Sequence, residues 1–344
     1  MSAFELYIGT YTVRDSQGIY RAVLSQAGLT GVSLVAALDN PTWVSCAPNG
    51  QLLACGGLGG NPNERPQGEL FAYKRVQDGG LAFCGKAGSG GIAPCHLAYA
   101  PSKGLAFVAN YHSGSLSAYR LTDSAPQRYA TLLLKELTRE PDEKVSHAHC
   151  CLVDRAEQRL FVCDLGLDSV FVFSLGDQGE LALVQRFVLP KGCGPRHAVL
   201  SPEEKLLYVV CELSSQLLVL DAQTGAVREC HKLTDSEFTG LAAAAAIRMD
   251  AAGQRLAVSC RGNDKLTLFR LGQDGGVTGR TEVPLSGSFP RDIVLTPDWC
   301  WLLAAYQHSD FVELFRLEAD GTMRSVQRLT VPSPVCLCLR EQKQ

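Results

Sequence analysis

The chain has 344 residues, of which 46% are hydrophobic and 19% are charged, so it can bury a substantial core and is not intrinsically disordered. Its net charge is −3 and its Lys and Arg residues are scattered, which argues against a nucleic-acid-binding protein because such proteins gather basic residues into a patch. The first residues lack a basic segment followed by a long apolar one, and the least polar run, Leu241–Ile247, is too short to cross a bilayer; we therefore expect no membrane partner and a cytoplasmic location.

One pattern recurs along most of the chain: a short apolar run, a tight turn, a second apolar run and a polar loop. The six copies begin at Asn40, Ala93, Ser146, Gly194, Ala243 and Phe289. Their turn residues are 47 to 53 residues apart. A period of about 50 residues with several short strands in each unit is typical of a β-propeller.

The two ends of the chain each carry half of this pattern. PSPVCLCL near the C-terminus matches the first half, whereas ELYIGTYT and the following GIYRAVL match the second half. Joined in one sheet they make a seventh unit and remove an open sheet edge. The sequence therefore predicts an all-β fold: a single seven-bladed β-propeller over residues 1–344, its ring closed by N- and C-terminal strands in one blade.

The fourteen cysteines lie mainly inside predicted strands, as in CCLVD and VVCEL. There Cys behaves as a small buried apolar residue, which fits a reducing compartment. No paired Cys-x-x-Cys motif indicates a zinc or haem site. We expect no metal and no cofactor.

The hairpin in each repeat predicts where polar side chains gather. Because its two strands are antiparallel, the start of the first strand and the end of the second lie at the same end of the blade, and these ends converge at one mouth of the propeller channel. The first position carries Trp43, Cys95, His96, His147, His149, Arg196, His197, Ala244, Ala245, Arg291 and Asp292, and the second carries Tyr111, Asp164, Glu212, Arg261 and Gln307. Such a set of Arg, His and Glu side chains in a concave pocket favours an anionic ligand.

Structural roles compete with binding roles at several of these positions. His96, His197, Asp292 and Gln307 fit hydrogen bonds between blades as well as they fit a binding role. Asp164 and Asp168 are better explained as braces of the loop DLGLDS, and Tyr111 either lines the pocket or packs on the next blade. A substrate clamp is the preferred interpretation for the set His149, Arg196, Glu212 and Arg261.

Several segments resemble the lactonase family of seven-bladed propellers, which includes bacterial 6-phosphogluconolactonases and the fungal carboxymuconate lactonizing enzyme. The matching segments are YIGTYT, ANYHSGSLSAY, SHAHCCLVD, DLGLDSVFVF, GPRHAVLSP, CELSSQLLVL and CRGNDKLTLF. They cover nearly every blade. The resemblance places the family's functional residues on His149, Arg196, Glu212 and Arg261.

The resemblance implies a lactone hydrolase similar to 6-phosphogluconolactonase, with a small anionic lactone or carboxylate as its partner. In this hypothesis His149 is the general base, Glu212 orients it or acts as the base itself, and Arg196 and Arg261 supply fixed positive charge. His147 could share the role of His149. His96, Tyr111 and Arg291 are expected to bind substrate.

Two other functions stay open. The same residues fit a cycloisomerase that closes a carboxymuconate-like acid to a lactone, and many propellers are non-catalytic scaffolds. In members that look like the sugar lactonases a Glu usually stands where this chain has Ala246, which leaves the natural substrate and the reaction direction open. The choice between His147 and His149 and the oligomeric state are open as well.

Overall fold

A computed structural model describes residues 3–57, 67–76, 79–138, 144–235, 238–318 and 322–342. Over these residues the strands form seven four-stranded antiparallel sheets, accompanied by two short 3₁₀ helices, η1 (Pro101–Lys103) and η2 (Leu134–Leu137). The predicted all-β fold with seven blades is thus confirmed. The part of the chain that is described contains no helix long and apolar enough to cross a membrane.

The chain divides into two compact units. Unit 1 comprises Met1–Ala37 and Val199–Gln344, and unit 2 comprises Leu38–Ala198.

Unit 2 contains three complete sheets, in the strand orders β4-β5-β6-β7, β8-β9-β10-β11 and β12-β13-β14-β15. Their strands are β4 (Trp43–Cys46), β5 (Leu52–Gly56), β6 (Glu69–Arg75), β7 (Leu81–Gly88), β8 (Pro94–Ala100), β9 (Leu105–Asn110), β10 (Ser115–Arg120), β11 (Gln127–Leu133), β12 (Ala148–Val153), β13 (Arg159–Asp164), β14 (Ser169–Leu175) and β15 (Leu181–Val188). The division between the units falls within β16 (Pro195–Leu200).

Unit 1 also contains three complete sheets, in the orders β28-β1-β2-β3, β20-β21-β22-β23 and β24-β25-β26-β27, and the strands β17, β18 and β19 of the sheet that β16 begins. Their bounds are β1 (Phe4–Thr10), β2 (Gly18–Ser25), β3 (Gly28–Ala37), β17 (Leu206–Cys211), β18 (Gln216–Asp221), β19 (Val227–Lys232), β20 (Ala243–Met249), β21 (Arg255–Arg261), β22 (Lys265–Leu271), β23 (Val277–Pro284), β24 (Pro290–Leu295), β25 (Trp301–Tyr306), β26 (Phe311–Leu317), β27 (Met323–Thr330) and β28 (Pro334–Glu341).

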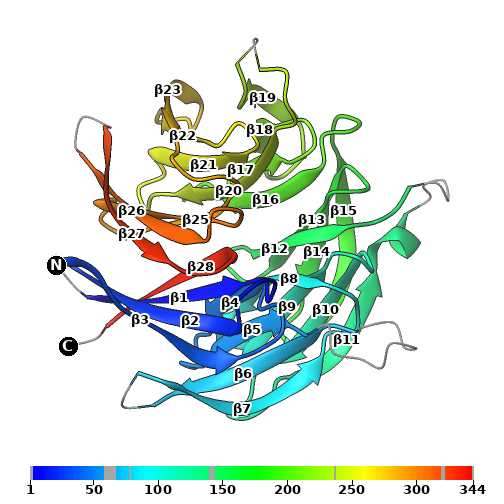
Figure 1. The fold of residues 1–344 in the computed structure, drawn as a ribbon. Coiled ribbons are helices and arrows are strands. Elements are labelled where there is room, and N and C mark those ends of the chain that lie inside the picture. Colours follow the sequence, from blue (N-terminus) through cyan, green and yellow to red (C-terminus); the bar gives the residue numbers. More distant parts are fainter. Residues whose placement is uncertain are drawn as a thin grey trace. The chain divides into compact units, whose positions relative to one another are not determined.

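The composite sheet predicted from the two chain ends is present in unit 1. β28 pairs antiparallel with β1, from Phe4 opposite Glu341 to Thr10 opposite Pro334. Figure 1 shows this pair as the red strand lying beside the blue one. The C-terminal strand supplies the first strand of a sheet whose other three strands come from the N-terminus.

Apolar side chains pack between neighbouring sheets within each unit. In unit 2 a cluster joins the sheet of β8 to the sheet of β12 and includes the buried rings of Phe107, Phe171 and Phe173. Burying an aromatic or branched aliphatic side chain of this size contributes about 1.5–3 kcal/mol. This packing holds the first hairpin of each sheet firmly enough to position polar side chains at its end.

A β-bulge recurs in the first strand of several sheets. In β8, Pro94 pairs with Asn110 and His96 pairs with Ala109, so Cys95 is an extra residue. The same irregularity leaves His149 as the extra residue in β12 and Arg291 as the extra residue in β24. A bulge bends its strand and re-aims a side chain, and this one lies at the end of the hairpin where the sequence places the candidate site.

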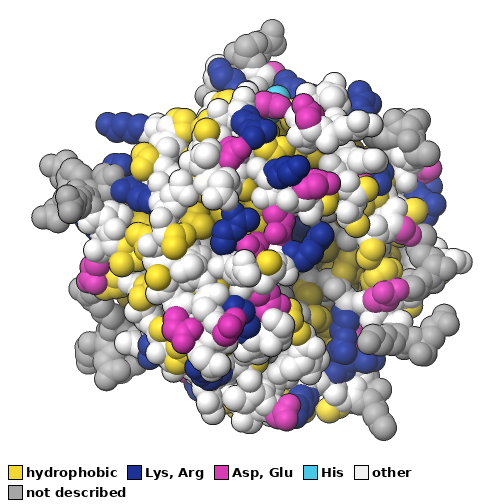
Figure 2. Space-filling model, turned by 180° about the vertical axis from the view of Figure 1, so that it is seen from behind, with side chains coloured by type: hydrophobic (Ala, Val, Ile, Leu, Met, Phe, Trp, Pro, Cys, Tyr) yellow, Lys and Arg dark blue, Asp and Glu magenta, His cyan; other side chains and the backbone are white. Residues whose placement is uncertain are grey.

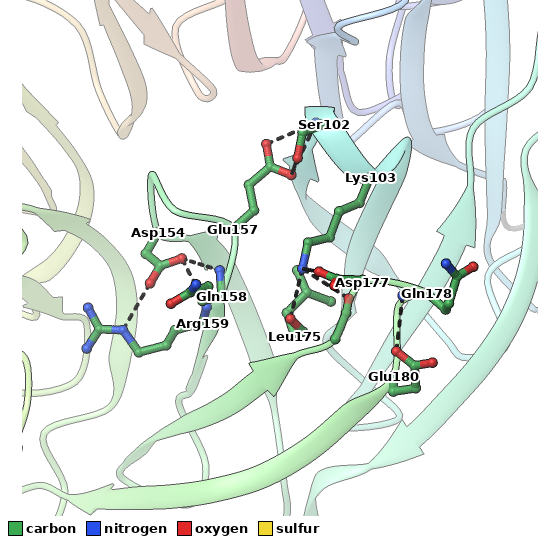
Figure 3. Close-up of polar contacts among 11 residues, drawn as sticks. Ser102, Lys103, Asp154, Glu157, Gln158, Arg159, Leu175, Asp177, Gln178 and Glu180 are labelled. Carbon is green, nitrogen blue, oxygen red and sulfur yellow. Dashed lines mark hydrogen bonds and ion pairs between the residues drawn. The ribbon is translucent and has the colours of Figure 1, made fainter.

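At the opposite end of the hairpins in unit 2, polar contacts connect consecutive sheets (Figure 3). Glu157, in the turn between β12 and β13, accepts hydrogen bonds from the backbone N–H of Ser102 at 3.0 and 3.1 Å and from its hydroxyl at 2.7 Å. Lys103 donates from Nζ to the carbonyl oxygen of Leu175 at 2.9 Å. These contacts tie the turn after β8 to the next sheet.

Asp292 connects three sheets of unit 1 through one buried carboxylate. Oδ1 accepts from Nη2 of Arg248 in β20 at 2.7 Å, and Oδ2 accepts from the backbone N–H of Leu337 in β28 at 2.8 Å. The side chain is almost fully buried. The structure therefore supports the inter-sheet role that the sequence offered for Asp292.

We expect Asp292→Ala to lower the free energy of unfolding by roughly 2–4 kcal/mol, because it leaves the Arg248 guanidinium and the Leu337 N–H without their acceptor. Urea unfolding followed by circular dichroism measures the change. Asp235→Ala is the matched control, since its ion pair with Lys265 lies at the surface and should matter little. Equal stability of the two variants would contradict the assignment.

Candidate functional site

Six ring side chains of unit 2 pack against one another and form what we call the imidazole cluster. His197 lies at its centre, with ring centroids 5.2 Å from His96 and 5.1 Å from His149. The members are Trp43, His96, Tyr111, His147, His149 and His197. They come from the hairpin ends that the sequence singled out. Antiparallel pairing brings them to one end of each sheet, and packing between sheets brings them together.

His147 and His149 both contact Tyr111 but differ in their surroundings. The ring of His147 stacks on Tyr111 at 4.5 Å, and its Nδ1 lies 3.1 Å from the Tyr111 carbonyl oxygen. His149 is the bulge residue of β12; it is buried and lies edge-on to Tyr111 at 5.6 Å and against His197. His149 is therefore the inner of the two, beside His197, and His147 is tied to the loop after β9.

Both ring nitrogens of His96 are engaged by β12. The backbone N–H of Cys151 donates to Nδ1 at 3.3 Å, and Nε2 lies 3.6 Å from Sγ of Cys150. Because Nδ1 accepts, the neutral ring carries its proton on Nε2 and directs it to the sulfur. His96 thus links β8 to β12. Its ring packs against Trp43 in the cluster, with 4.1 Å between the two ring centroids.

Cys150 is a buried neighbour of the cluster that the sequence did not single out. It pairs across the strands with Cys163, and the hydrogen bond between their side chains lowers the pKa of the Cys150 thiol well below its usual range, with His96 adding to the effect. A cysteine in an apolar strand gave no sign in the sequence that it would contact a histidine. The contact between Cys150 and His96 depends on how β8 packs on β12.

Arg196 brings a buried guanidinium to the same cluster. Its Nη1 lies 3.4 Å from Nδ1 and 3.3 Å from Nε2 of His197. Arg196 and His197 are 2% and 3% exposed, so the positive charge is placed where little water screens it. Sequence reasoning placed His197 and Trp43 at the right strand ends but did not identify them as members of one cluster.

Asp164 braces the loop after β13, as the sequence indicated, whereas the carboxylate of Asp168 holds the loop between β15 and β16. Asp164 accepts hydrogen bonds from the backbone N–H groups of His147 at 2.9 Å and Leu167 at 3.0 Å, and from the hydroxyl of Ser146. Asp168 accepts from the N–H groups of Gly192 and Gly194, each at 2.9 Å. Asp164 therefore fixes the segment that carries His147 into β12.

The remaining three predicted site residues lie in unit 1, where we call Glu212, Arg261, Phe289 and Arg291 the arginine cluster. Nη2 of Arg261 pairs with Oε2 of Glu212 at 2.6 Å, and its guanidinium lies over the ring of Phe289 at 5.0 Å. Burial lowers the pKa of Arg261, with the charge of Arg291 adding to the effect and Glu212 opposing it. Two guanidinium groups and one carboxylate are thus held close together.

Arg291 contacts Gln307 and Tyr11 at the edge of the arginine cluster. The guanidinium of Arg291 lies over Tyr11 at 5.3 Å, and its Nη1 is 3.5 Å from Oε1 of Gln307. As the bulge residue of β24, Arg291 occupies the same place in its strand as His149 does in β12.

Ala246 is packed in an apolar cluster with Ala257, Ile293 and Leu302, and its backbone N–H donates to Ser259. The position where the sugar-lactonase-like members usually carry Glu is therefore filled by core packing. Among the described ranges no group of three His, Cys, Asp or Glu side chains is arranged to hold a metal ion.

Comparison with known proteins identifies the family. Residues 5–339 match the family model described as "Lactonase, 7-bladed beta-propeller". This chain belongs to that lactonase family. The match confirms the resemblance noted from the motifs and, with the seven sheets, the β-propeller fold.

Named relatives span nearly the whole chain. A protein of Bacillus subtilis named 6-phosphogluconolactonase is 28% identical over 349 residues, covering 98% of each chain. A solved structure from Lactobacillus plantarum is 30% identical with a TM-score of 0.88, covering 99% of this chain and 100% of the other. The periplasmic gluconolactonase of Pseudomonas aeruginosa is 26% identical with a TM-score of 0.87, covering 98% and 99%. The family and these names support a lactone hydrolase.

The buried carboxyl of Asp164 should make the free energy of unfolding depend on pH. Burial raises the pKa of Asp164 above 3.8, so the folded state binds this proton more tightly than the unfolded state does. The stabilisation is present below about pH 4 and is lost as the pH rises through the higher folded-state pKa. Asp164→Asn cannot ionise, so the stability of wild type relative to this variant should fall over that range.

Urea unfolding of both proteins from about pH 4 to neutrality measures this difference. A difference that stays constant, or that grows as the pH rises, would contradict the sign derived for Asp164.

Proposed function

We propose that this protein hydrolyses a phosphorylated sugar lactone of the 6-phosphogluconolactone type. One observation carries the proposal: a buried imidazole at a bulge, His149, lies against His197, and the buried guanidinium of Arg196 contacts the same ring. A base and a fixed positive charge within one cluster are what attack of water on an ester carbonyl requires. The name of the Bacillus subtilis relative supports the choice of substrate.

In this mechanism His149 is the general base. It accepts a proton as water attacks the carbonyl carbon of the lactone, which forms a tetrahedral intermediate with negative charge on the former carbonyl oxygen. The intermediate collapses by breaking the bond to the ring oxygen, and His149 returns the proton to that oxygen. Imidazole suits both transfers because it titrates near neutral pH.

Arg196 stabilises the negative charge of the intermediate. Its guanidinium is held beside His197 in a site with little solvent, where a fixed charge interacts more strongly than it would in water. Trp43 and Tyr111 supply ring surfaces on either side of the histidines.

Glu212, Arg261 and Arg291 are assigned to the same reaction by the sequence and, for the first two, by the family resemblance. Two guanidinium groups suit a phosphate, which accepts several charge-assisted hydrogen bonds. The carboxylate of Glu212 pairs with Arg261 at 2.6 Å, so we assign it to holding that guanidinium in place rather than to proton transfer.

The face drawn in Figure 2 offers little support for the scaffold alternative. On the face drawn in Figure 2, Lys and Arg side chains are interspersed with Asp and Glu rather than gathered into one patch. A scaffold explains the link that His96 makes between β8 and β12, but it does not explain why the buried guanidinium of Arg196 lies beside His197.

His149→Ala should lower kcat/KM for 6-phosphogluconolactone by about 10²–10⁴ because general-base assistance is lost. The free energy of unfolding should change little by comparison. Hydrolysis is followed by acid release, corrected for the spontaneous reaction. His231→Ala is the control, since His231 lies on the outer strand β19 and pairs with Glu229. Full activity in the His149 variant would contradict the proposal, and loss of folding would favour a structural role.

Substrate comparison tests the reaction class. We expect a higher kcat/KM for 6-phosphogluconolactone than for unphosphorylated gluconolactone, and Arg261→Met should reduce this preference about tenfold or more while it leaves the unphosphorylated reaction less affected. Turnover of carboxymuconate without lactone hydrolysis would instead establish the cycloisomerase alternative.

A further inference from the structure

Several repeats open with a residue of positive φ that directly precedes a proline. They are Asn40, Ala93, Gly194, Phe289 and Ser333, with φ between 45° and 66°. Asn and Gly tolerate this left-handed conformation and Ala and Ser are small, whereas a bulky side chain there is an outlier. Phe289, at 66°, therefore carries backbone strain, and such strain clusters at functional sites.

The backbone of Phe289 is held by contacts that do not need its ring. Its N–H donates to Oδ1 of Asp264 at 2.8 Å, and its carbonyl oxygen accepts from the N–H of Gln307 at 3.1 Å. In unit 2 the N–H of Gly194 is held by Asp168 at 2.9 Å in the same way, with no side chain present. The turn therefore forms without an aromatic residue, and the ring of Phe289 needs another explanation.

The ring of Phe289 lies against the arginine cluster. Cζ of Arg261 is 5.0 Å from the ring centroid, and the exposed imidazole of His308 stacks on the ring at 4.2 Å between centroids. The attraction between a guanidinium and an aromatic ring is strongest where water is excluded, and Arg261 is only 4% exposed. The ring thus has a fixed place beside a buried positive charge.

The hydrogen bonds of Arg261 engage one part of its guanidinium. Nε donates to the carbonyl oxygen of Ala243 at 3.2 Å, and Nη2 donates to that of Ala244 at 3.3 Å. Nη2 also pairs with Glu212 at 2.6 Å. Among the described residues Nη1 has no hydrogen-bond partner, so it is the donor group that remains for a ligand.

We propose that Phe289 is a positioning residue for phosphate recognition: its ring holds the guanidinium of Arg261 so that Nη1 donates to the phosphate group of the substrate. This role rests on the proposed function, in which Arg261 and Arg291 bind the phosphate. A smaller residue at position 289 would relieve the backbone but would lose the contact with the guanidinium. The strain is therefore retained for the sake of the ring.

Isothermal titration of the full chain with 6-phosphogluconate and with unphosphorylated gluconate tests this role. Wild type should bind the phosphorylated acid more tightly. Phe289→Asn removes the ring and introduces a residue that already stands in the left-handed conformation at Asn40. It should weaken binding of 6-phosphogluconate about fivefold or more and change the affinity for gluconate by less than about twofold.

Phe289→Tyr is the matched control, because it keeps the aromatic ring; its affinity for both acids should stay within about twofold of wild type. A merely structural role would weaken the binding of both acids together. The proposal is therefore overturned if Phe289→Asn weakens both acids equally, if it leaves the affinity for 6-phosphogluconate unchanged, or if wild type does not prefer the phosphorylated acid.

Hydrolysis assays on the same proteins separate this role from the proposed reaction. If wild type does not hydrolyse 6-phosphogluconolactone but Phe289→Asn selectively weakens 6-phosphogluconate, the reaction is wrong and the role of Phe289 stands. If wild type hydrolyses the lactone and Phe289→Asn binds both acids as wild type does, the reaction stands and the role of Phe289 is wrong.

Discussion

The register of the first hairpin in each sheet is the constraint on which the candidate site depends. Antiparallel pairing brings the start of one strand and the end of the next to the same edge, and a single extra residue in the first strand then breaks the alternation of its side chains. In β12 that residue is His149 and in β24 it is Arg291. A polar side chain thereby leaves the face that regular alternation would give it, while in β12 the neighbouring Ala148 and Cys150 stay in the packed interior.

The loops around the bulge hold this arrangement in place. Asp164, at the end of β13, accepts backbone N–H groups on both sides of the site, and His96 bonds β8 to the backbone of β12. These are buried polar groups with defined partners, which gives the imidazole cluster a fixed geometry before any ligand binds. At the other end of each hairpin the contacts vary from sheet to sheet: in unit 2 Glu157 accepts from the N–H of Ser102, whereas in unit 1 Gly253 lies against the ring of Pro202.

Much of this could be predicted from the sequence because the signals were local and repeated. The spacing of the turns gave the number of sheets, and the half-repeats at the two ends gave the pairing of β1 with β28. The hairpin rule also placed His149 and Arg196 correctly at strand ends. The bulges could not be predicted, because an extra residue is visible only when both strands are in register. The central place of His197 and the contact of Cys150 with His96 depend on packing between sheets, which no local pattern encodes.

The central claim is that the imidazole cluster binds the lactone. A ¹H–¹⁵N spectrum of the histidine side chains, recorded while the product 6-phosphogluconate is added, tests it most directly. The account predicts that the resonances of His149 and His197 shift together and saturate, while that of His231, on the outer strand β19, stays unchanged. A saturable shift confined to His231, or no shift of His149 at any concentration, would contradict it.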